Sequence, residues 1–78
     1  MTDTTYNGWK NYETWNVSLW VQNDESMYEL ARDCGRRFMG WDILADMLAA
    51  VNPETPDGVR WDDASLDRPR LNEMLSEM

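Results

Sequence analysis

Carboxylates are the side chains with which this sequence is best equipped to do chemistry. Fifteen Asp and Glu residues stand against seven Lys and Arg residues, which gives a formal net charge of −8 at pH 7. Asp42 and Asp46 are spaced to share one face of a helix. Such a row of charges resembles the phosphates of a duplex, which carries one charge per ~1.7 Å of its axis. The candidate partner-binding residues are therefore these acids of the C-terminal half: Asp42, Asp46, Asp57, Asp62, Asp63, Glu73 and Glu77.

The same charges have an ordinary explanation, because small acidic proteins also use surface charge for solubility. Their distribution is nevertheless uneven. Residues 1–37 hold six acids and four bases, whereas residues 38–78 hold nine acids and three bases. An acidic surface repels nucleic acid and anionic membranes and attracts basic proteins. We therefore expect the partner to be a basic protein surface, without direct binding to nucleic acid or to a membrane.

Catalysis and metal binding are disfavoured by the composition. The chain has no His and a single Cys, so zinc lacks its usual ligands and proton transfer lacks its commonest side chain. The acidic segments "DASLD" and "DRPRLNE" lack the alternation of an EF-hand loop. A chain of 78 residues also leaves little room for a pocket that excludes water. We predict a protein that is not an enzyme and that uses no cofactor or metal.

The cellular location is predicted from what the sequence lacks. No stretch approaches the ~18 apolar residues of a membrane-spanning helix, and no basic and then apolar run resembles a secretion signal. The single Cys34 cannot form an internal disulfide and is interpreted as a small buried apolar residue. These features predict a protein of the cytoplasm.

The stretch "NYETWNVSLW", residues 11–20, predicts the first helix and much of the core. Asn11 is a candidate N-cap for a helix over about 12–21. Aromatic and apolar residues recur there at i, i+3 and i+7, the spacing of one helix face. In so short a chain, large rings are the main means of closing a core. The predicted core and scaffold residues of this helix are Tyr12, Trp15, Leu19 and Trp20.

Two further helices are predicted in the middle of the chain. Asp24 or Ser26 is the candidate N-cap of the first of these helices. Its apolar, inward-facing residues recur at helical spacing as far as Phe38. Gly40 is the expected stop signal of that helix. Residues 41–51 form the next one, which is apolar nearly all round and should be largely buried.

The last part of the chain is predicted as a loop followed by a final helix. Proline and glycine mark residues 52–58 as loop, and residues 59–61 fit a short extended segment. Asp67 is the candidate cap of a helix whose inward face is Leu71, Met74, Leu75 and Met78. The predicted fold class is mainly α: a compact bundle of about four short helices with a Trp-rich core. Residues 1–8 are expected to be a loose N-terminal arm and residues 9–78 a single helical domain.

The segment "NGWKNYETWNVSLWVQND" resembles the small proteins of phages, prophages and mobile elements that open with an Asn-Tyr-Glu-Thr-Trp-Asn…Leu-Trp signature. The similarity is strong over residues 7–31, and "TPDGVRWDD" resembles the later part of some members. Most of these proteins have no assigned function, so the resemblance implies a genomic setting and carries over no catalytic residue. Asn16 lies in mid-helix, where Asn is unfavourable, and we favour a buried side chain that is hydrogen-bonded to the backbone at a helix junction over a partner contact. The matching residues are Asn11, Tyr12, Glu13, Thr14, Trp15, Asn16, Leu19, Trp20, Asn23 and Asp24.

Together, charge, size and resemblance lead to one functional hypothesis. Phages encode small acidic inhibitors of host defence, some of which imitate DNA. We therefore expect an inhibitor of a host nucleic-acid-binding defence complex, of anti-CRISPR or anti-restriction type, that acts as monomer or dimer in the host cytoplasm.

Two alternatives remain open at this stage. In the first alternative, the protein is a phage adaptor that binds a host enzyme through exposed aromatic residues, with Trp9, Trp41 and Trp61 as anchors. Alternatively, it is a homo-oligomeric structural domain that pairs through the amphipathic last helix, which ends at Met78.

Overall fold

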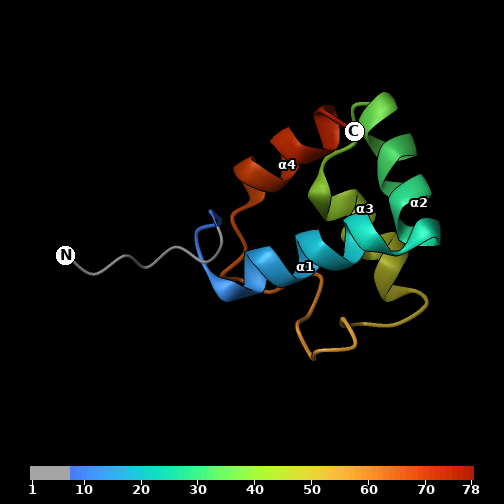
Figure 1. The fold of residues 1–78 in the computed structure, drawn as a ribbon. Helices are drawn as coiled ribbons and strands as arrows, with labels where there is room; N and C mark the ends of the chain where they lie inside the picture. The colour runs from blue at the N-terminus through green and yellow to red at the C-terminus, as the bar shows by residue number, and fades with distance from the viewer. Residues whose placement is uncertain (1–7) are drawn as a thin grey trace.

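The computed structural model describes residues 8–78, which form four short helices packed around one core (Figure 1). The second helix lies against each of the other three. This arrangement confirms the predicted all-α bundle. The helices are α1 (Tyr12–Asn23), α2 (Glu25–Arg36), α3 (Trp41–Ala49) and α4 (Arg68–Ser76). The predicted arm, residues 1–8, falls outside the described residues except for Gly8.

A long connection joins α3 to α4 and runs beneath α1 in the view of Figure 1. It contains a single isolated antiparallel bridge, between Glu54 and Arg60. Gly58 turns the chain between these residues with a φ of 88°, in the left-handed region that favours glycine. The extended segment expected near 59–61 is thus reduced to this bridge in the described part of the chain.

Three helices begin where the sequence predicts an N-cap. The side chain of Asn11 accepts a hydrogen bond from Thr14 N at 2.9 Å, and that of Asp24 accepts one from Met27 N at 3.1 Å. Asp67 likewise accepts from Arg70 N at 3.3 Å. Each cap satisfies an amide that the helix itself leaves without a partner, which typically stabilises by about 1 kcal/mol. Ser26, the other candidate cap of α2, lies inside that helix.

Trp41 and Trp61 form the aromatic centre of the core, and each is only 1% exposed. Their ring centroids are 6.3 Å apart. Trp41 Nε1 donates to the carbonyl of Trp61 at 2.8 Å, and Trp61 Nε1 donates to the carbonyl of Asn52 at 2.9 Å. Because both indole N–H groups are satisfied, the rings can be fully buried without leaving a polar atom unpaired.

The predicted inward face of α1 is confirmed only for Trp20, which is partly buried and packs against the core. Tyr12 is 39% exposed, and Trp15, Leu19 and Trp20 are only partly buried. The helix instead buries Thr14, Val17 and Val21, again at spacing i, i+3 and i+7, together with Asn16 and Ser18. The hydrophobic pattern misled because polar side chains occupy the true inner face, where each has a hydrogen-bond partner.

Gly35 sets the distance between α2 and α4. A Cβ atom built at this position would overlap the main-chain carbonyl of Leu75 on α4. Glycine therefore permits a close approach of the two backbones.

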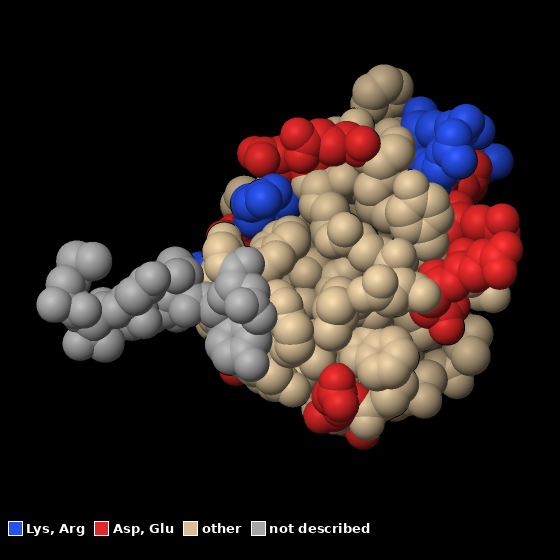
Figure 2. Space-filling model, in the orientation of Figure 1, with Lys and Arg blue, Asp and Glu red and all other residues tan. Residues whose placement is uncertain are grey.

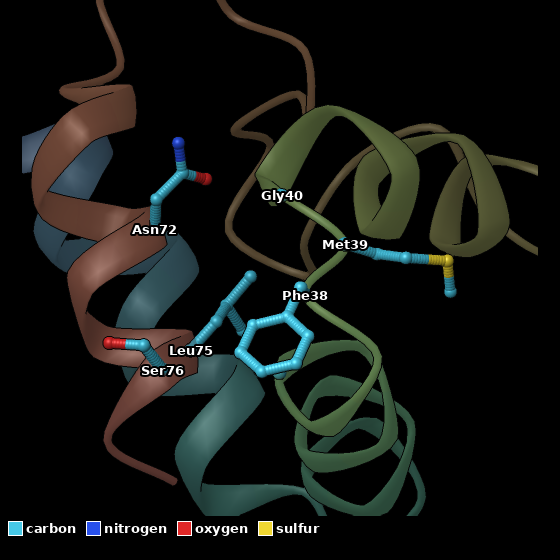
Figure 3. A pocket seen from close by; sticks show the side chains of 7 residues that line it. Phe38, Met39, Gly40, Asn72, Leu75 and Ser76 are labelled. Atoms are coloured by element: carbon cyan, nitrogen blue, oxygen red, sulfur yellow. The ribbon is translucent and has the colours of Figure 1, made fainter.

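The turn from α2 into α3 also departs from the prediction (Figure 3). The helix ends at Arg36, and Met39 N donates to Cys34 O at 2.9 Å while Phe38 N donates to Gly35 O at 3.2 Å. This is the Schellman arrangement, in which the residue with positive φ is usually glycine. Here it is Phe38, with a φ of 58° and a side chain that is 97% exposed rather than inward-facing. Gly40, the expected stop of α2, instead precedes α3.

Candidate functional site

Residues of the signature on α1 hold the loop that follows α3. Asn16 is completely buried; its amide donates to Asp57 Oδ2 at 2.8 Å, and its carbonyl accepts from Thr55 Oγ1 at 2.7 Å. Trp20 Nε1 donates to the same Asp57 oxygen at 2.9 Å. The hydroxyl of Thr55 also accepts from the amides of Asp57 and Val59, both at 3.2 Å. The buried, hydrogen-bonded role favoured for Asn16 is thereby confirmed, but its partners are side chains of the loop and not the backbone at a helix junction.

A second set of signature residues holds the segment that leads into α4. Asn11 donates to Ser65 O at 2.7 Å. Thr14 Oγ1 donates to Asn11 Oδ1 at 2.6 Å and accepts from Asp67 N at 3.0 Å. The buried polar side chains of α1 thus fix both ends of the segment 55–67.

Asp57 therefore takes part in the protein's own hydrogen-bond network, and its place among the partner-binding residues stays a prediction. Its carboxylate lies at the surface and accepts hydrogen bonds from Asn16 and Trp20. These two hydrogen bonds lower the pKa of Asp57 below its ordinary value of 3.8, because they favour the charged form.

The lowered pKa of Asp57 predicts a specific acid sensitivity. The folded protein binds this proton less tightly than the unfolded chain does, so the carboxylate stabilises the fold at pH values above 3.8. That contribution is lost as the pH falls from there through the lower folded pKa. We expect Asp57→Asn to lose less stability than the wild type over that interval, as measured by urea unfolding at a series of pH values. Equal losses in the two proteins would contradict the role given to this carboxylate.

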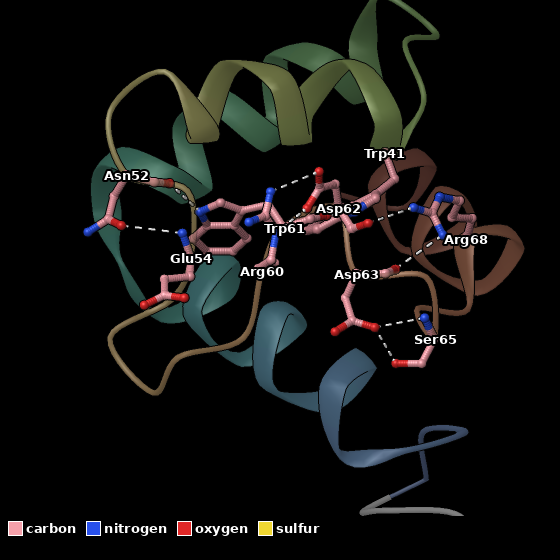
Figure 4. A network of polar contacts seen from close by, with 9 residues as sticks. All are labelled: Trp41, Asn52, Glu54, Arg60, Trp61, Asp62, Asp63, Ser65 and Arg68. Atoms are coloured by element: carbon pink, nitrogen blue, oxygen red, sulfur yellow. Dashed lines mark hydrogen bonds and ion pairs between the residues drawn. The ribbon is translucent and has the colours of Figure 1, made fainter.

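Arg68 gathers three of the candidate acids into one network, and Figure 4 shows its contacts with residues 62 and 63. Its Nε donates to Asp42 Oδ1 at 2.9 Å, and its terminal nitrogens reach the carbonyls of Asp63 and Asp62 at 3.3 and 3.4 Å. Arg60 adds an ion pair to Asp62 at 3.0 Å. Both side chains of each ion pair retain exposure to solvent, and the Asp42 side chain is 75% exposed.

Hydrogen bonds also hold the charged forms of Asp62 and Asp63. The guanidinium of Arg60 lowers the pKa of Asp62, and the hydroxyl and amide of Ser65, at 2.6 and 2.7 Å, lower the pKa of Asp63. Both carboxylates therefore keep their negative charge at neutral pH.

Asp46 and Glu73 lie on helices, and Glu77 directly follows α4. Glu73 pairs with Arg70 at 3.3 Å on α4. Asp46 on α3 and Glu77 after α4 are exposed, and neither has an ion pair within the described residues. The network thus brings Asp42, Asp62 and Asp63 together, and Asp46 lies one helical turn from Asp42 on α3.

The face shown in Figure 2 has its charges at the margins. Acidic atoms lie over α4 and along α2, basic atoms lie over the C-terminal end of α2 and beside the acidic atoms over α4, and the centre is uncharged. This pattern corrects the expectation of a single continuous anionic surface, at least on this face.

The aromatic adaptor hypothesis loses two of its three anchors. Trp41 and Trp61 are buried and hydrogen-bonded, so neither ring is available to a partner. Trp9 is partly buried against the core, and the guanidinium of Arg70 lies 4.6 Å from the centre of its ring. This cation–π contact gives Trp9 a place within the fold.

Catalytic and metal-binding groups are sparse in the described part of the chain. Residues 8–78 contain no cluster of three or more His, Cys, Asp and Glu side chains that could hold a metal ion. Burial raises the pKa of the Cys34 thiol, with the charge of Asp33 adding to the effect, so the reactive thiolate is disfavoured. No helix within residues 8–78 is long and apolar enough to span a membrane.

The fold and surface together define a small four-helix protein whose charge is strongly acidic. A family model described as a family of unknown function, DUF7249, matches residues 2–78, so the chain belongs to this family. No curated protein and no solved structure matches the chain.

Proposed function

We propose that this protein is a small acidic binding protein of a phage or mobile element that inhibits a host nucleic-acid-binding defence complex, of CRISPR–Cas or restriction type. It acts in the host cytoplasm by occupying a basic surface of that complex, without catalysis and without a cofactor. The proposal is supported above all by the pairing of the arginines in residues 38–78. All three of them, Arg60, Arg68 and Arg70, are held by carboxylates of the same half.

This pairing leaves a large anionic surplus. Nine acids minus three bases give residues 38–78 a net charge of −6, and no arginine of this half is left over to shield the other carboxylates. A surplus of this size attracts a basic surface and accelerates encounter with it. The attraction weakens with salt, because exposed charges are screened over ~8–10 Å at physiological ionic strength.

The network around Arg68 supports the proposal in a second way. It fixes Asp42 on α3 relative to the main chain at 62 and 63. Carboxylates that are already positioned lose little conformational freedom when a partner binds. A basic groove that normally grips phosphates therefore meets charges at defined places.

A transformation assay tests the proposal. Host cells with an active CRISPR–Cas or restriction system receive a targeted plasmid, with and without expression of this protein. We expect the wild type to restore transformation. We expect Asp46→Lys combined with Asp62→Lys to reduce that protection roughly tenfold, since the loss of about 1.4 kcal/mol of binding free energy lowers affinity by that factor. Both side chains are exposed, so the fold should tolerate the changes.

The matched control reverses two acids of the other half, Glu25→Lys and Glu29→Lys. It changes the net charge by the same amount and should protect as well as the wild type. Protection that survives in the Asp46 and Asp62 variant would refute the acidic-surface proposal. Equal loss in both double variants would show that total charge, and not this half of the surface, determines activity.

A further inference from the structure

A pocket of about 280 Å³ opens where the start of α2 stands beside the end of α3 (Figure 1). Its walls are mainly apolar. Leu48 and Trp61 belong to the buried core, whereas Met27, Leu30 and Met47 are only partly buried. Methionine side chains adapt to the group that packs against them. The pocket therefore offers an apolar surface to a long, flexible side chain.

Asp24 is the one charged residue among those that line this pocket. Its side chain is partly buried and forms no ion pair within residues 8–78. Oδ1 accepts a hydrogen bond from Met27 N at 3.1 Å, whereas no group of the described chain donates to Oδ2. One oxygen of this carboxylate is therefore available to a cation.

The main chain around the pocket also favours a positive charge. α1 and α3 both end beside it, and neither helix has a basic residue in its last turn. The carbonyl end of a helix attracts a cation, and the opposing amide end of α2 is already capped by Asp24.

The basic residues nearest in sequence leave this preference in place. Arg60 is adjacent to Trp61, but its guanidinium pairs with Asp62 at 3.0 Å. Arg32, two positions after Leu30, is exposed and does not line the pocket. The carboxylate of Asp24 is thus left as the charged group at the pocket.

We propose that this pocket binds the side chain of a lysine from a partner protein. The methylene chain lies against Met27, Leu30 and Met47, and the ammonium group donates to Asp24 Oδ2. Lysine meets both requirements, because its long stem packs on apolar surface while its charged end stays close to water. Arginine suits the site less well, since a guanidinium prefers two carboxylate oxygens and Oδ1 already accepts from Met27 N.

This inference deepens the proposed function and rests on it for the kind of partner, because a basic protein surface supplies such lysines. Its test uses small probes and no host system, so the two proposals can fail separately. Loss of protection in host cells with lysine binding intact would count against the inhibitory function alone.

Methyl NMR of the full chain, titrated with N-acetyl-lysine methylamide, tests the site. N-acetyl-norleucine methylamide is the matched probe, since it has a similar stem without the ammonium group. We expect the lysine probe to shift the methyl signals of Met27, Leu30 and Met47. It should bind roughly tenfold more tightly than the norleucine probe, the effect of a charge-assisted hydrogen bond. The corresponding arginine probe should bind more weakly than the lysine probe.

Asp24→Asn should remove the preference for lysine over norleucine. Asparagine caps a helix as well as aspartate does, so the variant should keep the N-cap of α2 and its fold. Glu25→Gln is the matched control, because it removes the same charge at the next position. Glu25 is exposed and does not line the pocket, so this variant should keep the preference of the wild type.

Three results would overturn the inference. The lysine probe leaves the methyl signals of the pocket unchanged; it binds no more tightly than the norleucine or the arginine probe; or its advantage over norleucine survives in Asp24→Asn.

Discussion

Replacing Gly35 with alanine is expected to destabilise the protein by about 3 kcal/mol, the upper range for inserting a methyl group into a packed interior. The added Cβ would overlap the carbonyl oxygen and carbon of Leu75, which are main-chain atoms of α4 and cannot rotate away. The two helices would have to separate, and the core between them would lose contacts. Urea unfolding followed by circular dichroism measures the change.

Helix propensity makes the opposite prediction for the same variant. Alanine in a helix interior is favoured over glycine by about 1 kcal/mol. A Gly35→Ala protein that is at least as stable as the wild type would therefore contradict the close approach of α2 and α4.

Gly40→Ala is the matched control. Its Cβ would meet Asn72 Oδ1 at 3.1 Å, and this side-chain atom can shift. We expect the control to lose about 1 kcal/mol or less, chiefly through the poorer N-cap.

Replacing Asn16 with alanine is also expected to cost about 3 kcal/mol. The change removes the acceptor of the Thr55 hydroxyl and one of the two donors to Asp57 Oδ2. The Thr55 hydroxyl loses its partner in a buried position, which costs about 1–3 kcal/mol, whereas the exposed Asp57 carboxylate can bind water instead. Because Thr55 also accepts from the amides of Asp57 and Val59, the turn itself should loosen.

Asn23→Ala provides a control on the same helix. Its amide donates to Leu19 O at 2.9 Å, but the side chain is exposed and water can replace it. We expect a loss within about 0.5 kcal/mol, as for most surface substitutions. Similar losses for Asn16→Ala and Asn23→Ala in urea unfolding would show that the Asn16 network adds little to stability.

Local signals in the sequence were sufficient to predict the helices. Asn11, Asp24 and Asp67 are caps whose partners lie three residues further on, so the information is contained in short stretches. The inward face of α4 was predicted correctly for the same reason, since Leu71, Met74 and Leu75 follow simple helical spacing and all are buried.

The orientation of α1 could not be predicted, because it depends on a segment about forty residues away. Asn16 is separated from Asp57 by 41 positions and from Thr55 by 39. These polar partners allow Asn16 and Thr14 to be buried beside Val17 and Val21, so the buried face of the helix is not the one with the large rings. The large rings left outside are half-buried, and the core is closed instead by Trp41 and Trp61, which flank breaks in the sequence.

The sequence predicted the acidic charge of the candidate site but not how its residues are arranged in space. The pairs Arg60 with Asp62 and Arg70 with Glu73 are separated by two and three positions, so sequence spacing contained a signal for them. No such signal exists for Arg68 and Asp42, which are 26 positions apart and meet only because α3 and α4 pack together.

The central claim is that the signature side chains on α1 hold the 55–67 segment, which leaves the acidic surface free to bind. Amide hydrogen exchange at Thr55–Val59 tests this claim most directly. In the wild type we expect the Val59 amide, which is bonded to Thr55 Oγ1, to be protected. In Asn16→Ala we expect this turn to exchange faster than α2 and α3, which keep their own core contacts. Unchanged exchange of the turn in a folded Asn16→Ala protein would contradict the claim.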